Sequence, residues 1–177
     1  QENVIHRDLK PGNILIDNGK ALLTDFGLAQ MVESNSQSVS MSGGVAGTYN
    51  YMPPEVFNNE PATPAADVYA LGCVVYEMLT GKMLFDGVTT AAIIGAHLKG
   101  ISLDEPLPEG TPPGTREVIQ IALAKDPLDR YATAAELANE LQRAATDRLT
   151  GPYAQLEQAL AGQNWPAALA LAAEIRA

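Results

Sequence analysis

The sequence contains little cysteine, little positive charge and no long apolar run, and each shortage narrows the class of protein. Cys73 is the only cysteine among 177 residues, so no disulfide framework can form, and a reducing compartment is the simpler interpretation. Lys and Arg number 11 against 21 Asp and Glu, which argues against a nucleic-acid binder with its basic face. No apolar run reaches the roughly 18 residues needed to span a bilayer. We therefore expect neither a nucleic-acid partner nor a membrane segment in this chain.

The beginning of the chain favours a fragment. No basic stretch followed by an apolar run is present, so there is no signal peptide. The first residue is Gln1 rather than Met, and the first recognisable motif, His6 to Asn13, arrives with no lead-in. The hydrophobic content of 46% is ordinary for a chain that buries a core. We expect one domain with a short appendage.

The pattern of residues predicts one β-hairpin followed almost entirely by helices and loops. NILID and KALLTDFG flank Asn18-Gly19, a strong signal for a hairpin turn. The Ser- and Gly-rich stretch 27–52 predicts a long loop. Apolar residues cover nearly all sides of the stretch 67–81, which indicates a buried helix that Gly81 ends. Thr133 and Glu136 have capping-box spacing. Further helices are predicted over 91–98, 117–124, 134–145, 153–161 and 165–176.

The hairpin brings several chemical groups to one place. Asn13 precedes the turn and Asp25 follows it by a similar number of residues, so they should come to the same end of the hairpin, nearly opposite each other. Both supply hard oxygen atoms, as Mg²⁺ prefers. Asp8 lies on the approach to this end, and Lys10 adds a positive charge. A base, a cation and two metal ligands suit phosphoryl transfer, in which catalysis is mostly positioning and charge neutralisation. Any one of these residues alone would more often be a cap or a solvated charge.

The ordered motifs resemble those of the eukaryotic-type (Hanks-type) Ser/Thr protein kinases, and of their bacterial members most of all. His6-Arg7-Asp8-Leu9 with Asn13 resembles the catalytic loop, and Asp25-Phe26-Gly27 resembles the metal-binding motif. Further matches are the end of an activation segment, the start of a central helix and a late arginine: Gly47-Thr48, Tyr51-Met52, Pro53-Pro54-Glu55, Asp67 to Gly72, and Arg130. Lys10 followed by Pro11 is the Ser/Thr type of sequence. The resemblance covers residues 1–145.

This resemblance implies ATP and Mg²⁺ as cofactors and Ser/Thr residues of proteins as substrates. For the chemistry it implies a base that accepts or orients the substrate proton (Asp8), a cation on the transferred phosphoryl group (Lys10) and Mg²⁺ ligands (Asn13, Asp25). For the nucleotide it implies an apolar floor under the adenine (Leu15). The supporting roles that it implies are a residue that holds the base and the cation (Thr48), an anchor for the catalytic-loop backbone (Asp67), a structural ring under that loop (His6) and a buried ion pair (Glu55, Arg130).

The resemblance also implies regulation. An arginine in the position of Arg7 often meets a phosphate on the activation loop in this family, and Ser40 and Ser42 stand where bacterial relatives often carry phosphorylated hydroxyls. A phosphate there could order the loop through charge-assisted bonds. The partner that the resemblance implies for such autophosphorylation is a second kinase copy, in a dimer. Bacterial relatives often carry a transmembrane helix after a cytoplasmic kinase domain, and we expect a cytoplasmic location for these residues. The alternative for the serines is a loop that they keep soluble.

The front of a kinase has no counterpart in the sequence. A kinase needs a glycine-rich loop over the phosphates, a strand lysine and a helix glutamate that pairs with it. The cluster 43–47 does not replace that loop, because it lies inside the activation segment. We therefore predict a mainly α (α+β) fold: a kinase-like C-lobe, helical with a short β-hairpin at the active site, without the N-lobe. Residues 1–145 would form this partial domain and 146–177 a helical tail. We expect little or no activity from the chain alone.

Three other interpretations remain open. A small-molecule phosphotransferase shares a similar His-x-Asp-x4-Asn loop, but Asp25-Phe26-Gly27 and the Glu55/Arg130 pair argue against it. A pseudokinase scaffold would have been favoured by loss of Asp8, Asn13 or Asp25, and all three are present. The tail NWPAALALAAEI resembles half of a tetratricopeptide-like helical hairpin, although a plain Ala-rich helix is the simpler interpretation.

Two isolated residues suggest no site. Cys73 lies within the predicted buried helix and is interpreted as a small core residue. His97, near the end of a short predicted helix, is expected to be solvated or to cap that helix.

Overall fold

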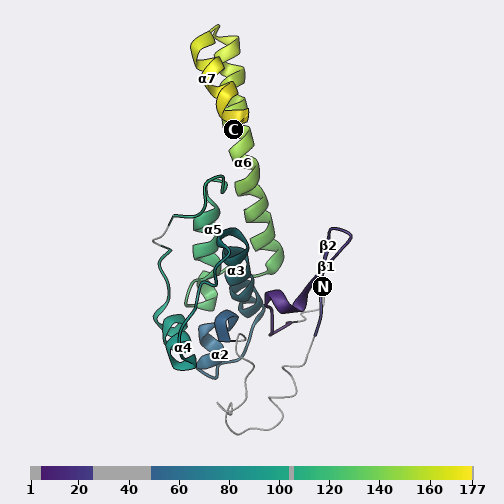
Figure 1. The fold of residues 1–177 in the computed structure, drawn as a ribbon, viewed down its shortest axis with the longest axis vertical. Helices are drawn as coiled ribbons and strands as arrows, with labels where there is room; N and C mark the ends of the chain where they lie inside the picture. The colour runs from purple at the N-terminus through teal and green to yellow at the C-terminus, as the bar shows by residue number, and fades with distance from the viewer. Residues whose placement is uncertain (1–4, 26–48, 104–105, 177) are drawn as a thin grey trace.

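The computed structural model describes residues 5–25, 49–103 and 106–176. Within them the chain is mostly helical, with one two-stranded antiparallel hairpin (Figure 1). The elements are the strands β1 (Ile14–Asp17) and β2 (Lys20–Leu23), the 3-10 helices η1 (Pro11–Asn13), η2 (Tyr49–Tyr51) and η3 (Pro127–Asp129), and the α-helices α2 (Pro54–Phe57), α3 (Pro64–Thr80), α4 (Thr90–Lys99), α5 (Thr115–Ala122), α6 (Ala134–Ala161) and α7 (Trp165–Arg176). The predicted class, mainly α with one hairpin, is confirmed at this level.

The predicted hairpin is present around the predicted turn. Ile14 pairs with Leu23 and Asp17 with Lys20, which leaves Asn18 and Gly19 as the two turn residues. Both have positive φ, 50° and 76°, the backbone that a tight type I′ turn requires. The hairpin stands away from the helical body, at the side opposite α4 and α5 (Figure 1).

Helix α3 forms the centre of the body, as its apolar sequence predicts. Tyr69 and Cys73 belong to one buried cluster, and Val68 belongs to a second cluster shared with α5 and α6. The helix ends at Gly81, whose φ of 70° and N–H bond to the Glu77 carbonyl form a left-handed cap. Cys73 is 1% exposed, and burial raises the pKa of its thiol. It is the core residue that the sequence predicts.

Gly72 allows α3 and α5 to approach closely. A Cβ added at this position would lie 3.1 Å from the Cβ of Ala122 and 3.2 Å from Leu123. Helix α5 covers 115–122 rather than the predicted 117–124, because the chain leaves the helix at Leu123. Asp126 then caps η3 by accepting from the Leu128 N–H at 2.9 Å.

Helix α6 corrects the sequence prediction of two helices, 134–145 and 153–161. It begins as predicted: the Thr133 hydroxyl accepts from the Glu136 N–H at 3.1 Å, and Glu136 accepts from the Ala132 N–H at 2.9 Å. The helix then runs without interruption through Gly151-Pro152, and its total length is 28 residues. Proline removes one backbone hydrogen bond, but α7 packs back along this part of α6 (Figure 1). Tertiary packing therefore outweighs the local signal for a break.

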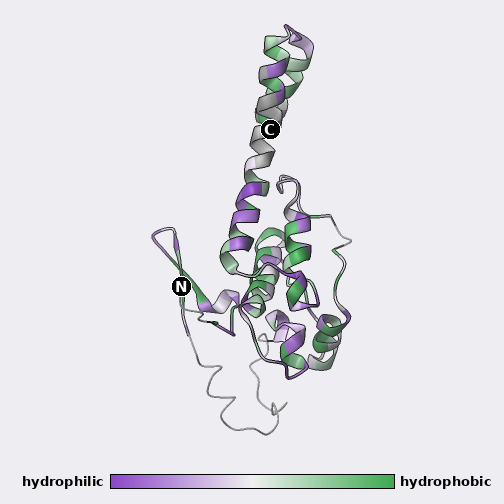
Figure 2. Cartoon of the chain, turned by 180° about the vertical axis from the view of Figure 1, so that it is seen from behind, coloured by the Kyte–Doolittle hydropathy of each residue, from purple (hydrophilic) through white to green (hydrophobic). Residues whose placement is uncertain are grey.

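The C-terminal helical pair projects from the body. A short connection at 162–164 reverses the chain, and Ala168 is buried where α7 meets α6. Hydrophilic and hydrophobic residues alternate along the first half of α6 (Figure 2), in keeping with a helix that packs on α3 and α5 through one face. None of the described helices is long and apolar enough to cross a membrane.

Candidate active site

Asp67 holds the loop that precedes the hairpin. Its carboxylate, in the first turn of α3, accepts from two backbone N–H groups, that of His6 at 2.7 Å and that of Arg7 at 2.9 Å. Arg7 has a φ of 69°, a left-handed conformation that such a residue rarely adopts without support. The two charge-assisted bonds supply this support. Asp67 thus connects the first turn of α3 to the backbone of this loop.

The His6 ring joins the same loop to the end of β2. The ring is buried, and its Nε2 lies 2.8 Å from the Thr24 carbonyl oxygen. Because a carbonyl only accepts, Nε2 carries the hydrogen. The other nitrogen, Nδ1, is then free to accept from the Asp8 N–H at 3.4 Å. The imidazole thus ties the backbone of Asp8 to the strand.

Two nitrogen donors converge on one oxygen of Asp8. Lys10 Nζ lies 2.8 Å from Asp8 Oδ2, and Asn13 Nδ2 lies 2.9 Å from the same atom. Asn13 Nδ2 also donates to the Asp8 carbonyl at 2.8 Å. Asn13 is buried, whereas the side chains of Lys10 and Asp8 are 24% and 25% exposed. The carboxylate is therefore held in place and still reaches solvent.

Asp25 lies at the same end of the hairpin, one residue beyond direct opposition to Asn13. The strand register places Thr24 opposite Asn13, and the Thr24 N–H donates to the Asn13 carbonyl at 3.0 Å. Asp25 follows with a φ of 60° and an exposed side chain. Among the described residues no group of three His, Cys, Asp or Glu side chains could hold a metal ion.

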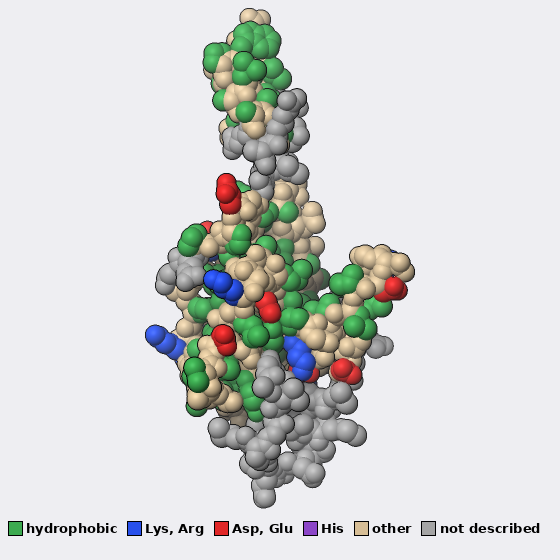
Figure 3. Space-filling model, viewed as in Figure 1, with side chains coloured by type: hydrophobic (Ala, Val, Ile, Leu, Met, Phe, Trp, Pro, Cys, Tyr) green, Lys and Arg blue, Asp and Glu red, His purple; other side chains and the backbone are tan. Residues whose placement is uncertain are grey.

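Both faces of the hairpin are apolar and exposed. Leu15 and Leu22 form a cross-strand pair on one face and are 54% and 48% exposed. Ile16 and Leu23, on the other face, are 73% and 41% exposed. Hydrophobic side chains cover much of the projecting hairpin in the space-filling view (Figure 3). An isolated two-stranded hairpin with exposed apolar faces is marginally stable at best.

Glu55 and Arg130 form a buried bidentate ion pair. Arg130 Nη1 and Nη2 each lie 2.8 Å from one Glu55 oxygen, and both side chains are almost fully buried. Arg130 also donates to three backbone carbonyls, those of Ala65, Ala124 and Lys125, and its guanidinium lies 4.7 Å from the centre of the Tyr69 ring. The hydrogen bonds offset the desolvation of the two charges.

Sequence reasoning missed two contacts that fix the segment before α2. The Tyr51 hydroxyl donates to Glu77 Oε2 at 2.5 Å, and Asn50 Nδ2 donates to the Phe85 carbonyl at 2.5 Å. Burial and the Glu77 carboxylate raise the pKa of Tyr51. The partners lie 26 and 35 positions away in the sequence, and no spacing pattern links such distant residues.

His97 is buried, so the expectation of a solvated or capping residue was wrong. It is 0% exposed and contacts three aromatic rings, those of Phe57, Tyr69 and Phe85. Its Nδ1 lies 2.8 Å from the Tyr69 hydroxyl, and Nε2 has no hydrogen-bond partner of good geometry among the described residues. Burial lowers the pKa of His97 to about 4, and the nearby Tyr49 backbone partly opposes this shift.

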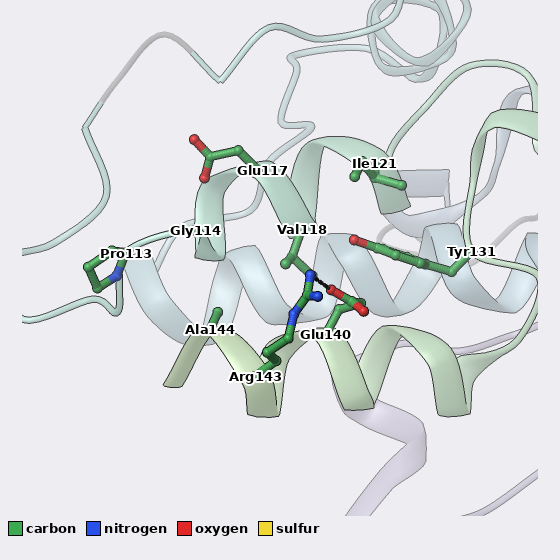
Figure 4. A pocket seen from close by; sticks show the side chains of 9 residues that line it. All are labelled: Pro113, Gly114, Glu117, Val118, Ile121, Tyr131, Glu140, Arg143 and Ala144. Atoms are coloured by element: carbon green, nitrogen blue, oxygen red, sulfur yellow. Dashed lines mark hydrogen bonds and ion pairs between the residues drawn. The ribbon is translucent and has the colours of Figure 1, made fainter. Parts of the chain in front are cut away.

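Some predicted site residues fall outside the described part of the chain, and one cavity lies apart from this site. Phe26, Gly27, Ser40, Ser42 and Thr48 fall outside the described residues. A small cavity of about 180 Å³ lies between α5 and α6 (Figure 4). It is lined by Pro113, Gly114, Glu117, Val118, Ile121, Tyr131, Glu140, Arg143 and Ala144, with an ion pair between Arg143 and Glu140. None of the predicted site residues lines it.

Comparison with known proteins assigns the chain to a family. Residues 1–141 match the sequence profile of the protein kinase domain. The chain belongs to the protein kinase family. Similar relatives of this kinase chain include the serine/threonine-protein kinase PknB of Mycobacterium tuberculosis, 38% identical over 149 residues (81% of this chain and 23% of the relative), and PknA of the same species, 42% identical over 137 residues (77% and 31%). The probable serine/threonine-protein kinase PknB of Corynebacterium glutamicum is 38% identical over 150 residues (79% and 23%).

The chain spans less than a third of the length of these curated relatives. The predicted resemblance to bacterial Hanks-type Ser/Thr kinases is confirmed. Kinases of this family use ATP and Mg²⁺ and act on proteins.

Proposed function

We propose that residues 1–145 form the larger, C-terminal lobe of a Ser/Thr protein kinase. The complete enzyme transfers the γ-phosphoryl group of ATP to Ser or Thr hydroxyls of proteins. The convergence of Lys10 and Asn13 on a single oxygen of Asp8 carries the proposal. Here a cation and an amide hold the carboxylate of Asp8, and a second carboxylate, that of Asp25, lies at the same end of the hairpin. This arrangement suits phosphoryl transfer better than a structural cap.

Asp8 accepts or orients the proton of the substrate hydroxyl. Both donors contact its Oδ2, which leaves Oδ1 to accept from the incoming hydroxyl. Lys10, held 2.8 Å from the carboxylate, brings positive charge toward the transferred group. Because the loop backbone is fixed by Asp67 and His6, these groups need little rearrangement when substrate binds.

Asn13 and Asp25 fit a magnesium ion that arrives with its nucleotide. Both hydrogens of the Asn13 amide point to Asp8, so Oδ1 is the atom that faces a metal. Asp25 is exposed at the same end. Mg²⁺ is commonly held by one or two protein oxygens together with substrate phosphates. The donor set therefore suits this use better than a resident all-protein site. When bound, the ion neutralises phosphate charge.

The hairpin supplies the surface for the nucleotide and for a second lobe. Leu15, on one face, forms the apolar floor under the adenine, and Ile16, on the other, lies against the N-terminal lobe. The exposure of both faces supports this assignment. Residues 146–177 form a helical tail beyond the lobe, although α6 crosses this boundary without interruption. Because these 177 residues contain no glycine-rich phosphate loop, the chain alone is inactive.

Phosphorylation of the activation segment regulates the enzyme in this proposal. Ser40 and Ser42 are the proposed acceptors, a second kinase copy is the donor, and the resulting phosphate pairs with Arg7. Mass spectrometry of the active complete protein tests this step. Absence of phosphate between residues 27 and 47 would remove it, without affecting the proposed transfer chemistry.

The main test is phosphate transfer by the complete protein that contains these residues. We expect Mg²⁺-dependent transfer from γ-labelled ATP to Ser/Thr peptides, and only background transfer with residues 1–177 alone. Asp8→Asn should lower the rate by about 10²- to 10⁴-fold, the usual contribution of a positioned acid or base. Asp17→Asn is the matched control, because Asp17 lies at the exposed hairpin turn. Equal rates for the two variants would contradict the assignment of Asp8.

A further inference from the structure

His97 sits at the centre of an aromatic cluster that joins four parts of the fold. Its ring stacks on Phe85, with centroids 3.7 Å apart and planes 27° apart. The rings of Tyr69 in α3 and Phe57 in α2 lie 5.7 Å and 5.6 Å away. Phe57 in turn stacks on Tyr49 of η2, at 6.5 Å. Helix α4, which carries His97, thereby contacts α2, α3 and η2 through one residue.

The stack on Phe85 reaches the segment that precedes Glu55. The Phe85 carbonyl accepts from Asn50 Nδ2 at 2.5 Å, and Asn50 is 5% exposed. Phe85 itself is 3% exposed and lies in a connection without regular structure. Because no helix or strand fixes this carbonyl, its position depends on the packing of the Phe85 ring. Its ring lies nearer to His97, with centroids 3.7 Å apart, than to Tyr69, at 6.2 Å.

The same cluster reaches the other end of this segment through Tyr69. The Tyr69 hydroxyl lies 2.8 Å from His97 Nδ1, and the Tyr69 ring lies under the Arg130 guanidinium. Arg130 is bound to Glu55. The stretch 50–55 is thus held at both ends, by Asn50 on Phe85 and by Glu55 on Arg130, and His97 contacts the supports of both.

We propose that His97 is a positioning residue, which fixes the segment Tyr49–Tyr51 by holding Phe85 where its carbonyl accepts from Asn50. This inference rests on the proposed function and extends it: we place this segment, which resembles the end of an activation segment, on the protein-substrate side of the site. The imidazole acts through its ring. A neutral ring stacks on Phe85 as a phenyl ring does, and burial keeps His97 neutral near pH 7.

A space-filling role alone explains the residue less well. The Nε2 atom of His97 has no hydrogen-bond partner of good geometry among the described residues, although the Tyr49 backbone lies close enough to oppose part of the shift in the pKa of the ring. The contact that distinguishes His97 from a residue that only fills volume is the stack on Phe85, whose carbonyl accepts from Asn50.

Hydrogen exchange on residues 1–177 tests the proposal without any need for activity. We expect His97→Ala to speed exchange in peptides covering 49–53 by about tenfold, as the loss of a local support would. The Met52 N–H, which donates to the Tyr49 carbonyl at 3.4 Å, is the reporter. His97→Phe keeps the ring and should restore protection to within about twofold. The rate of hydrogen exchange in α5 should change only as far as the variant lowers the global stability of the fold.

Leu137→Ala is the matched control. Leu137 is 2% exposed and packs with Val118 and Ala122 in the other buried cluster, so its truncation lowers global stability without touching Phe85. Asn50→Ala provides a second route to the same result if His97→Ala fails to fold. It should release 49–53 as His97→Ala does, and the double variant should add nothing further.

Three outcomes would overturn the positioning role: exchange at 49–53 no faster in His97→Ala than in Leu137→Ala, no rescue by His97→Phe, or additive effects of the two alanine variants. In the complete kinase, His97→Ala should raise KM for a peptide substrate and leave KM for ATP unchanged. An equal rise in both would overturn the link to the substrate side. Absence of any kinase activity, with the exchange result intact, would refute the proposed function while the positioning of 49–51 stands.

Discussion

Acidification from pH 7 to pH 4 should destabilise this fold through His97, one of two histidines in the chain. The perturbation is protonation of a ring that is 0% exposed. The groups nearest to it are the Tyr69 hydroxyl from α3 and the Tyr49 backbone from η2. Neither is an anion that could stabilise an imidazolium. Burial therefore lowers the pKa of His97 to about 4.

The magnitude follows from the difference between the pKa values of the folded and unfolded states. The unfolded value is near 6.5, so the unfolded chain binds the proton first as the pH falls. The contribution of His97 is fully favourable above about pH 6.5 and is lost as the pH falls toward 4. At about 1.4 kcal/mol per pKa unit, the loss is about 3 kcal/mol in the free energy of unfolding.

Urea unfolding measured at several pH values, for the wild type and for His97→Phe, isolates this effect. Protonation of carboxylates contributes to both proteins alike, so the difference between the two curves reports His97. We expect the wild type to lose about 3 kcal/mol more than the variant between pH 7 and pH 4. A titration of the two imidazole signals by NMR gives an independent reading. Parallel stability curves, or a His97 signal that titrates near pH 6.5, would refute the reasoning.

Three substitutions test other parts of the packing by urea unfolding at pH 7. Arg130→Met leaves the carboxylate of Glu55 buried and unpaired, and we expect a loss of about 3–5 kcal/mol; a smaller loss than about 1 kcal/mol would show that water reaches the carboxylate. Gly72→Ala places a methyl group 3.1 Å from Ala122, and overpacking of about 1–3 kcal/mol should outweigh a gain of about 1 kcal/mol in helix propensity; a more stable variant would contradict this. Asp67→Asn replaces one of the two acceptor oxygens with an NH2 donor and removes the negative charge from the bond that remains, with an expected loss of about 1.5–3 kcal/mol, and an unchanged unfolding midpoint would argue against a tethering role.

The sequence predicted those parts of the fold in which neighbouring residues contain the determining signal. The turn at Asn18-Gly19 needs two residues that tolerate positive φ, and both are adjacent in the chain. Gly81 ends α3 for the same local reason. The candidate site was also predictable in outline, because Asp8, Lys10 and Asn13 lie within a few residues of one another and hydrogen bond directly.

The remaining features depend on contacts between residues that are distant in the sequence. Nothing near His97 indicates that Phe85 and Tyr69 will enclose it, so a polar residue near a helix end was interpreted as solvated. Gly151-Pro152 gives a strong local signal for a break, yet α6 continues through it, because α7 packs alongside. In both places tertiary packing decides the outcome, and no short window of sequence reports it.

The proline within α6 gives the last part of the chain a modular character. Pro152 offers no N–H to the carbonyl of Arg148, so the helix has its weakest turn between two segments that pack on different partners. The earlier segment contributes Leu137 and Ala144 to the body, and the later one packs with α7. The projecting pair could therefore be exchanged for another sequence at that turn without repacking the body. In this architecture the appendage can diverge, through insertion, replacement or loss, at a different pace from the candidate active site.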